Sequence, residues 1–488
     1  MKFYPHLNHL CRLLLLGLWL SSGWNLAATP DTSLTVKTIL FSGNKKTKGW
    51  ILLREMTLKE GDVVSLASLQ AELEQSRKNI YNLDLFNQVQ LRHSLIPGGI
   101  LIEVGVQERW YIFGTPNVGL EERNSYDFVG ALRARNLERL VYGGTVQWRN
   151  VTGRNETLFI RAQAGFSRRL WVEFIRPALW RKANIDFRAG VNLTAQKSVI
   201  LGTEAGRVQW RGLVDIPLQR HARVFSGLTK RFGLYKRLYA ELSWRQYTLP
   251  ADSLAAFPLF DEPARYISQP DGLERFAGLV VQFLEDRRDL RAFPWQGYKY
   301  QVLGRLGGGP GSTTRFAKLG ASWAHHLPFG RRRRWNFSYG FSQVYTFGSG
   351  VPFPEKTVLG IGRREFLGLS RELRGFEPYA IDGTWLSLNK AALSFAIIPR
   401  KIIRIPYVPF AVFQNMPIGL YLSAHTDHAY VQDNSFNNLD QFLKNRHLVG
   451  YGIGLNVISF YDLLLRIEFT RNNLGENGLY FNTTVPIK

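Results

Sequence analysis

The chain has 488 residues and is strongly basic, with 62 Lys and Arg against 38 Asp and Glu and a formal net charge of +24 at pH 7. Its single cysteine, Cys11, lies near the N-terminus, which excludes a disulfide-stapled fold and a cysteine-based metal site in the rest of the chain. Although 45% of the residues are hydrophobic, the mean hydropathy is −0.15, and no stretch reaches the roughly 20 apolar residues of a membrane-spanning helix. Two classes remain, a large soluble β protein and a membrane barrel with a wet interior.

The first 28 residues have the layout of a secretory signal peptide. Lys2 and Arg12 are its basic residues, Leu13–Leu20 form an apolar core that is too short to cross a bilayer, and Ala27-Ala28 supply small residues for cleavage. We therefore expect this segment to be removed and the mature chain to be exported.

Residues 34–113 combine helical and strand patterns. The predicted elements are a strand, two helices and two strands, at Val36–Phe41, Gly49–Leu58, Ser65–Leu83, Val89–Ser94 and Ile100–Val106. This order predicts a small α+β domain whose sheet has an exposed edge, where an extended peptide can add a strand. An unrelated α+β plug or a carbohydrate-binding module would give the same pattern.

From residue 114 to the end, apolar and polar residues alternate over long segments. The alternation is clearest in Ala183–Ala195, Trp335–Phe347 and Leu463–Thr470. Period-two segments of roughly ten residues are long enough for tilted membrane crossings, whereas ordinary soluble strands have about five or six residues. Residues 114–488 therefore predict an all-β transmembrane antiparallel barrel of about 16 strands, with a soluble sandwich as the alternative.

Three groups of residues carry more specific signals. The N-terminal domain contains Gly43, Asn44, Gly61 and Phe86, a predicted hairpin contains Asp286, Arg288, Asp289 and Gly297, and a loop near residues 360–384 contains Arg374, Gly375 and Phe376. In order and spacing these groups resemble motifs of the outer-membrane assembly and translocation superfamily of BamA, TamA and the two-partner secretion pores. The resemblance implies one periplasmic POTRA domain at residues 34–113 and a bacterial outer-membrane barrel at residues 114–488, with the Arg374 loop inside its lumen.

Arg374 is the residue to which the resemblance gives a role. A guanidinium carried into a barrel lumen needs counter-charges, because a desolvated unpaired charge costs several kcal/mol. Asp427 is the first predicted partner, from its place in a strand motif, and Glu468 is the second, because it shares a polar strand face with Arg466. Alternatively, Arg374 is one exposed loop arginine among many.

Some positions depart from the family pattern. Ala392 and Ser394 stand where many relatives carry Glu and Arg, and Ala429 replaces a motif glycine after Asp427. The chain ends in Ile487-Lys488 rather than in the aromatic residue common in outer-membrane barrels. We expect the network around Arg374 to be altered.

Three functions remain open. The first is an assembly factor that accepts unfolded clients at the POTRA edge and inserts them through a seam between the first and last barrel strands. The alternatives are a translocation pore for a secreted partner protein and a passive porin or structural barrel. No nucleophile-elbow, phosphate-loop or zinc-protease motif is present, so we expect no enzyme, no cofactor and no metal site.

The expected partners follow from the same considerations. They are unfolded or secreted client proteins, outer-membrane lipid with anionic headgroups and accessory assembly proteins. The headgroups are expected because of basic clusters such as Arg331–Arg334. Nucleic acid is a poor partner for an exported barrel.

Overall fold

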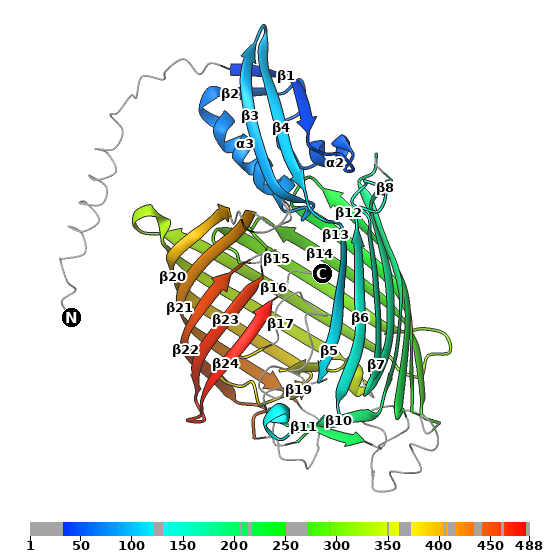
Figure 1. Cartoon of the computed structure of the whole chain (residues 1–488). Helices are drawn as coiled ribbons and strands as arrows, with labels where there is room; N and C mark the ends of the chain where they lie inside the picture. The colour runs from blue at the N-terminus through cyan, green and yellow to red at the C-terminus, as the bar shows by residue number, and fades with distance from the viewer. Residues whose placement is uncertain are drawn as a thin grey trace, which may run out of the picture.

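The computed structural model describes residues 33–120, 130–135, 137–180, 182–204, 207–212, 217–249, 271–291, 293–348, 351–360, 372–404, 407, 415–433, 442–459 and 463–484. The predicted signal peptide lies outside these residues. Within them, a small α+β domain sits on one end of a large curved antiparallel sheet (Figure 1).

The small domain contains four strands and two helices. Its elements are β1 (Ser33–Ser42), α2 (Gly49–Leu53), β2 (Val63–Ser65), α3 (Leu66–Tyr81), β3 (Phe86–Ile96) and β4 (Gly99–Glu108). The strand order is β2-β1-β4-β3, with β1 and β4 parallel. The helices cover an apolar core in which Ile51, Ile80 and Phe86 are fully buried. The sheet therefore has two edges, the three-residue β2 and the eleven-residue β3.

Two details differ from the predicted elements. The first helix stops at Leu53 rather than Leu58, because Thr57 turns its backbone N–H to the Ser76 hydroxyl of α3, at 3.0 Å. The short strand β2 was not expected, and it forms by pairing Val64 with Leu34 of β1. As predicted, α3 follows its cap Ser65, whose hydroxyl accepts a hydrogen bond from the Ser68 N–H at 3.2 Å.

The large sheet has 16 antiparallel strands, which agrees with the predicted barrel. They are β5 (Ile112–Leu120), β6 (Leu140–Arg149), β7 (Thr157–Gly165), β8 (Ser167–Trp180), β9 (Ile185–Gln196), β12 (Gln219–Phe232), β13 (Lys236–Thr248), β14 (Leu273–Asp286), β15 (Gly297–Gly308), β16 (Phe316–Phe329), β17 (Trp335–Phe347), β20 (Trp385–Arg404), β21 (Asn415–Gln432), β22 (His447–Ile458), β23 (Leu464–Asn472) and β24 (Asn477–Thr484). Each strand pairs with its neighbour in this order, and β5 and β24 form the two ends of the sheet (Figure 1).

Side chains alternate between the two faces of this sheet. On β23, for example, Leu465, Ile467 and Phe469 are exposed on the outer face, whereas Glu468 and Thr470 are buried on the inner face. An apolar outer face and a polar inner face suit a barrel with lipid outside and a wet lumen inside. None of the described helices has the length and apolar character needed to cross a bilayer.

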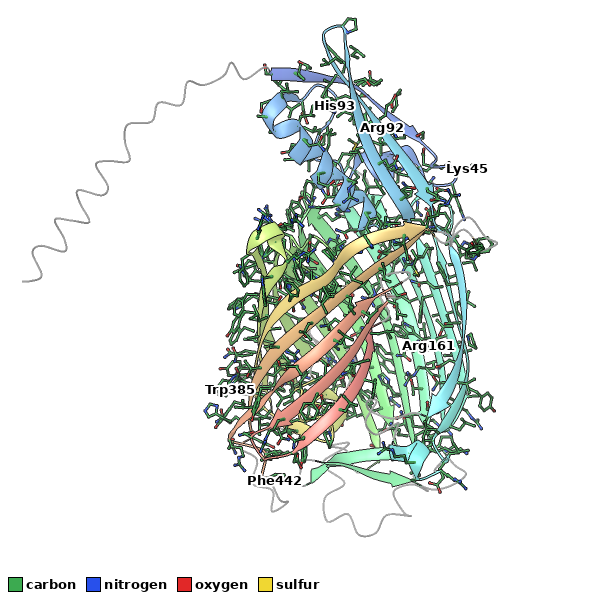
Figure 2. All side chains as sticks on the ribbon, turned by 60° about the vertical axis from the view of Figure 1, so that its left-hand side comes forward. Lys45, Arg92, His93, Arg161, Trp385 and Phe442 are labelled. Carbon is green, nitrogen blue, oxygen red and sulfur yellow. The ribbon has the colours of Figure 1, made fainter. Side chains whose placement is uncertain are left out.

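The POTRA-like domain fixes which end of the barrel is which. β5 follows this domain directly, so the starts of β5, β7, β9 and each second strand thereafter lie at the same end of the barrel as the domain (Figure 1). Trp385, at the start of β20, and Phe442 lie at the opposite end (Figure 2). The turn with Arg331–Arg334, between β16 and β17, is at the domain end.

The domain contacts the barrel rim at separate places. The Asn150 side-chain amide donates to the Thr47 hydroxyl at 2.8 Å, between the β6–β7 turn and the domain. On β12, Arg231 forms a bidentate pair with Glu55, with N–O distances of 2.7 and 2.9 Å. On β20, the Arg400 guanidinium donates to the Tyr81 hydroxyl at 2.8 Å. The two parts therefore share a polar interface.

Smaller elements extend the barrel at the far end. β10 (Ser198–Glu204) and β11 (Arg207–Gly212) form a hairpin between β9 and β12. The segment between β17 and β20 contains the short helix η3 (Phe353–Glu355) and the paired strands β18 (Thr357–Leu359) and β19 (Ile381–Gly383). This segment carries the Arg374 loop.

Candidate functional site in the barrel lumen

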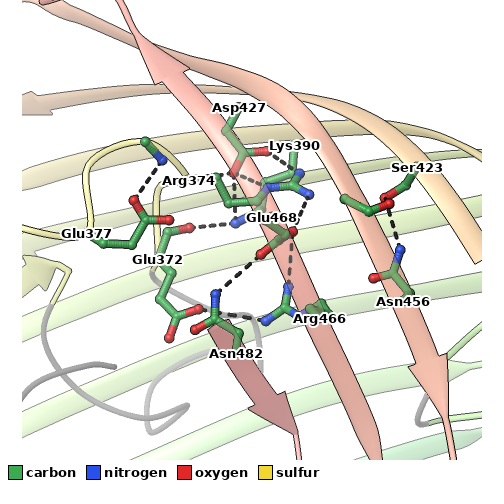
Figure 3. Close-up of polar contacts among 12 residues, drawn as sticks. Glu372, Arg374, Glu377, Lys390, Ser423, Asp427, Asn456, Arg466, Glu468 and Asn482 are labelled. Carbon is green, nitrogen blue, oxygen red and sulfur yellow. Dashed lines mark hydrogen bonds and ion pairs between the residues drawn. The ribbon is translucent and has the colours of Figure 1, made fainter. Parts of the chain in front are cut away.

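The loop between β18 and β19 places Arg374 against the inner wall of the barrel (Figure 3). The Arg374 Nε donates to Asp427 at 2.9 Å, a second guanidinium nitrogen also donates to Asp427, and the Arg374 backbone N–H reaches the same carboxylate at 3.2 Å. Glu468 accepts from the remaining guanidinium nitrogen at 3.4 Å. Asp427 is 0% exposed and Glu468 1%, so these contacts neutralise charge that water does not reach. The two predicted partners, on β21 and β23, thus both lie at Arg374.

Lys390 is a part of this network that sequence reasoning missed. Its ammonium lies 3.0 Å from the Asp427 carboxylate, and β20 and β21 pair these two residues directly. Lys390 is two residues before Ala392 and so lies on the same face of β20 as Ala392 and Ser394, the two positions where many relatives carry charges and this chain does not. The parity of the strand was therefore the signal that could have found it. This charged residue of β20 is therefore displaced by two residues, from Ala392 to Lys390, relative to the charged positions of the family.

Further polar contacts extend the network toward the last strand. Arg466 lies 4.0 Å from Glu468 and 3.9 Å from Glu372 of the loop. Asn482, on β24, donates to Glu468 at 3.3 Å. A chain of polar contacts therefore joins the loop to the final strand of the barrel (Figure 3).

Glycines allow the loop backbone to approach the wall. A Cβ on Gly450 of β22 would lie 1.7 Å from the Arg374 carbonyl oxygen, so only glycine fits there. Gly375 itself has φ +87°, a conformation that favours glycine, and its carbonyl accepts from the Asn472 amide at 2.8 Å. The positive φ of Gly375 therefore explains why the motif has a glycine at this position.

The neighbouring residues form an apolar cluster at the far end of the lumen. Leu373 is 2% exposed and Phe376 3%, and both pack among buried residues of the barrel wall and the loop. Ala429, which replaces a family glycine, is 3% exposed within this cluster. The motif Phe376 therefore acts as an apolar anchor beside the ionic one.

A second buried ionic anchor holds the other arm of the loop, and no sequence motif marks it. Glu355, which is 1% exposed, lies 3.0 Å from Arg245 on β13 and 2.6 Å from Arg305 on β15. The Tyr247 hydroxyl donates to the same carboxylate at 2.8 Å. Because β13 and β15 are far in the sheet from β21 and β23, the segment crosses the lumen from one wall to another.

The hairpin residues lie at the POTRA end of the barrel. Arg288 forms a bidentate pair with Asp286, with N–O distances of 2.7 and 2.8 Å. Asp289 accepts from three backbone N–H groups of the turn, and its own carbonyl accepts from the Asn82 amide of the small domain at 3.3 Å. Gly297 has φ +104°, and a Cβ there would lie 2.1 Å from the Arg287 carbonyl oxygen. This motif shapes a turn that touches the small domain.

The four residues singled out in the small domain have structural positions. Gly43 has φ +80°, and a Cβ there would lie 1.9 Å from the Val106 carbonyl oxygen. The Asn44 amide donates to the Thr47 carbonyl at 2.9 Å, Gly61 has φ +92°, and Phe86 is fully buried. Thr47 is also the residue that meets Asn150, so this turn supports the interface with the barrel.

The network has no arrangement typical of metal coordination. Across the part of the chain that the structure describes, no three His, Cys, Asp or Glu side chains are grouped to hold a metal ion. His425 is buried beside the Arg374 network, and neither of its ring nitrogens has a protein hydrogen-bond partner among the described residues. The geometry is that of a charge-paired loop anchor.

A POTRA-type domain in front of a 16-stranded barrel defines an outer-membrane β-barrel protein with a periplasmic domain. The sequence profile of the Omp85 superfamily domain matches residues 150–483, and that of the surface antigen variable number repeat, a POTRA domain, matches residues 34–109. The chain belongs to the Omp85 superfamily.

Individual relatives agree with this assignment. The chain is 22% identical over 276 residues to the outer membrane protein assembly factor BamA of Nitratidesulfovibrio vulgaris, a match that spans 56% of this chain but 30% of that protein. BamA from Haemophilus ducreyi lacking POTRA domains 1–3 has the same fold, with a TM-score of 0.51, 16% identity, and coverage of 92% of this chain and 84% of that one. CdiB from Escherichia coli has a TM-score of 0.55 at 12% identity, over 92% of this chain and 76% of that one.

Proposed function

We propose that this chain is an outer-membrane insertion factor that accepts unfolded barrel proteins at its POTRA edge and passes them to the seam between β5 and β24. The observation that carries the proposal is the open pairing of the sheet. Among the described residues, each neighbouring pair of the 16 strands is joined by a ladder, but β5 and β24 are not paired with each other. The edges of these two strands present the row of backbone donors and acceptors with which a client strand would pair.

The physical reason lies in the solvent around the seam. Lipid offers no hydrogen bonds, so an unpaired N–H or C=O at a barrel edge costs several kcal/mol when it is exposed to hydrocarbon. A client strand that pairs with β5 or β24 satisfies these groups and its own at once. The seam can therefore template a strand without reading its side chains.

The POTRA edge offers the same chemistry in water. β3 pairs with β4 on one side, and among the described residues its other side has no strand partner. Its middle carries exposed polar residues, including Arg92 and His93, which lie on the outer part of the domain (Figure 2). An extended client can add to such an edge through its main chain.

Two other functions compete with insertion. A translocation pore would pass a secreted partner through the lumen, which requires the loop to release Arg374 on one wall and Glu355 on the other. A passive porin would leave the POTRA edge and the seam without a role. The double anchor of the loop favours the lateral route through the seam. Accessory assembly proteins are further proposed partners of this chain.

A crosslink across the seam tests the proposal. Val118 on β5 and Leu479 on β24 are both exposed on the outer face, so cysteines there are accessible to a bismaleimide whose spacer is chosen to span the seam. With Cys11 also replaced, these are the sole thiols. We expect the crosslinked protein in proteoliposomes to lose client insertion, measured as heat-modifiable mobility of a barrel client.

The matched control joins two strands that are already paired. Val118 faces Tyr142 of β6 in the ladder, so a V118C/Y142C crosslink adds the same chemistry without closing the seam. Full insertion by the seam-crosslinked protein would exclude the lateral route. Depletion in the host separates the competing functions, because loss of many barrel proteins indicates insertion and loss of one exported protein indicates translocation.

A further inference from the structure

The outer wall of the barrel has an apolar hollow in the half away from the POTRA domain. Its volume is about 990 Å³, and strands β12 to β17 line it. Small outward-facing residues form its floor, namely Ser226, Ala277, Gly308 and Ala317. Large exposed side chains surround them, namely Val224, Leu242, Trp244, Leu279, Leu306 and Phe347.

Arginines stand above this hollow. Arg315 lines it directly, and its Cγ lies 3.3 Å from where a Cβ on Gly308 would be, so its stem lies along the floor glycine. Arg275 precedes Ala277 by two residues on β14 and so projects from the same outer face. The Thr313 N–H donates to the Arg275 carbonyl at 3.2 Å, which brings the two arginine segments together.

The charges of both arginines are available. Arg275 and Arg315 are exposed, and no ion pair or side-chain hydrogen bond is made by either guanidinium within the described residues. The nearest acidic residue in sequence, Glu274, is 0% exposed and points to the inner face. Two unpaired guanidiniums above an apolar hollow form an amphipathic site that faces the membrane.

We propose that this hollow binds a phosphorylated, acylated lipid of the outer leaflet, with a headgroup phosphate between Arg275 and Arg315 and an acyl chain over the small-residue floor. Guanidinium pairs recognise phosphate through charge-assisted, often bidentate hydrogen bonds. Trp244 sits on one wall of the hollow, and its amphipathic ring suits a position below the headgroup level. Charge above and apolar surface below match this ligand in both parts.

The position of the hollow gives the lipid a task. It spans β12 to β17, in the middle of the sheet, whereas the seam lies at the sheet ends β5 and β24. A lipid bound here holds the wall opposite the seam in the outer leaflet. This site is independent of the proposed insertion function, because it needs neither the seam nor the POTRA edge.

The test measures lipid binding to the full-length protein by native mass spectrometry in a neutral detergent. The probe is hexa-acylated lipid A, and the comparison ligands are phosphatidylcholine and inorganic phosphate. We expect R275Q/R315Q to bind lipid A about tenfold more weakly, because it loses two charge-assisted contacts. Binding of phosphatidylcholine is expected to stay unchanged in this variant, and inorganic phosphate is expected not to displace lipid A.

Two further variants make the result specific. K45Q/R92Q removes the same charge from exposed positions of the POTRA domain and is expected to bind lipid A like the unaltered chain. A277L fills the floor with a larger apolar group on a lipid-facing surface and is expected to weaken lipid A binding with both arginines intact. Equal affinities of R275Q/R315Q and K45Q/R92Q, full affinity of A277L, or displacement by inorganic phosphate would each overturn the proposal.

Discussion

Arg374 lies between two buried carboxylates, and its guanidinium donates three hydrogen bonds that tie its loop to them. Without it, Asp427 would keep Lys390 at 3.0 Å, and Glu468 would keep Arg466 at 4.0 Å. Removing one partner of a buried ion pair typically costs about 3–5 kcal/mol where the other charge is left uncompensated, and these remaining cations keep the wall below that cost. The loop is therefore the element that yields when Arg374 is altered.

We expect Arg374→Ala to leave the barrel folded but to free the loop, with impaired client insertion. Arg374→Lys should restore only part of the activity, because an ammonium lacks the fork that meets Asp427 with two nitrogens. The measurements are heat-modifiable mobility for the barrel, protease cleavage for the loop and insertion in proteoliposomes. Normal activity of Arg374→Ala would exclude the proposal that client insertion depends on the lumen anchor.

Gly450 allows the same displacement without a change of charge. Gly450→Ala should free the loop, because the new Cβ would lie 1.7 Å from the Arg374 carbonyl oxygen. Gly304→Ala on β15 is the matched control, since the new Cβ would lie 3.8 Å from the Leu319 methyl carbon, an ordinary van der Waals contact. Equal protease sensitivity of the two alanine variants would contradict a role for close backbone approach.

Individual site residues differed in how far the sequence could predict them. Asp427 and Glu468 could be proposed as partners because one lies in a recognisable strand motif and the other on a polar strand face. Strand parity could have placed Lys390 on the polar face of β20, but its pairing with Asp427 and the approach of Gly450 to the loop depend on strand register, which brings residues together only in the folded sheet. Glu355 has no motif around it, and two of its partners, Arg245 and Tyr247, lie 110 and 108 residues earlier in the chain.

At the scale of elements, strand patterns were most informative where lipid faces the sheet. β17 spans Trp335–Phe347, the segment in which outward aromatic residues alternate with smaller ones. β20 extends for 20 residues to Arg404, and its register shifts near Ala396 and Lys401. This extension leaves the alternating pattern and meets the POTRA domain through Arg400, a tertiary contact that local sequence does not encode.

The turn between β16 and β17 is strained in a way that composition alone does not reveal. Arg332 and Arg333 have φ of +59° and +50°, a region that favours glycine and asparagine. We expect R332N/R333N to stabilise the barrel by about 1 kcal/mol, because asparagine tolerates this backbone at lower cost. The urea midpoint of unfolding, followed by tryptophan fluorescence, measures the change.

Charge must be separated from backbone strain in this turn. Arg331 is exposed like its neighbours but is not among the residues with positive φ. Arg331→Asn therefore removes like-charge repulsion without relieving strain. If this variant gains as much stability as R332N/R333N, repulsion among the arginines is the cause and the strain argument is wrong.

At the scale of the whole molecule, the Glu55–Arg231 pair ties the POTRA domain to the barrel. Burial raises the pKa of the Glu55 carboxyl, but the charge and hydrogen bonds of Arg231 outweigh burial and lower the pKa from 4.5 to about 2. Because the pKa of Glu55 is lower in the docked state, the ion pair stabilises docking at pH values above the ordinary pKa of 4.5. This stabilisation is lost as the pH falls through the lowered pKa. Docking should therefore be complete above pH 4.5 and weaken toward pH 2.

Energy transfer between dyes on the two parts measures this docking. Lys45 on the domain and Arg331 on the barrel are exposed and accept cysteine-linked dyes. We expect the transfer efficiency of the unaltered pair to fall as the pH decreases from 4.5 toward 2. Glu55→Gln should lack this transition, and an identical transition in that variant would assign the pH response to other groups.

The two anchors of the lumen segment bind strands that lie on opposite sides of this segment in the sequence. The partners of Glu355 lie on β13 and β15, which are made before the segment, whereas the partners of Arg374 lie on β21 and β23, which are made after it. The Glu355 ion pairs need only strands that precede the segment, but the Arg374 ion pairs need strands near the C-terminus. The Arg374 ion pairs therefore form only on a chain whose C-terminal strands are in place, which makes them a checkpoint for completed assembly.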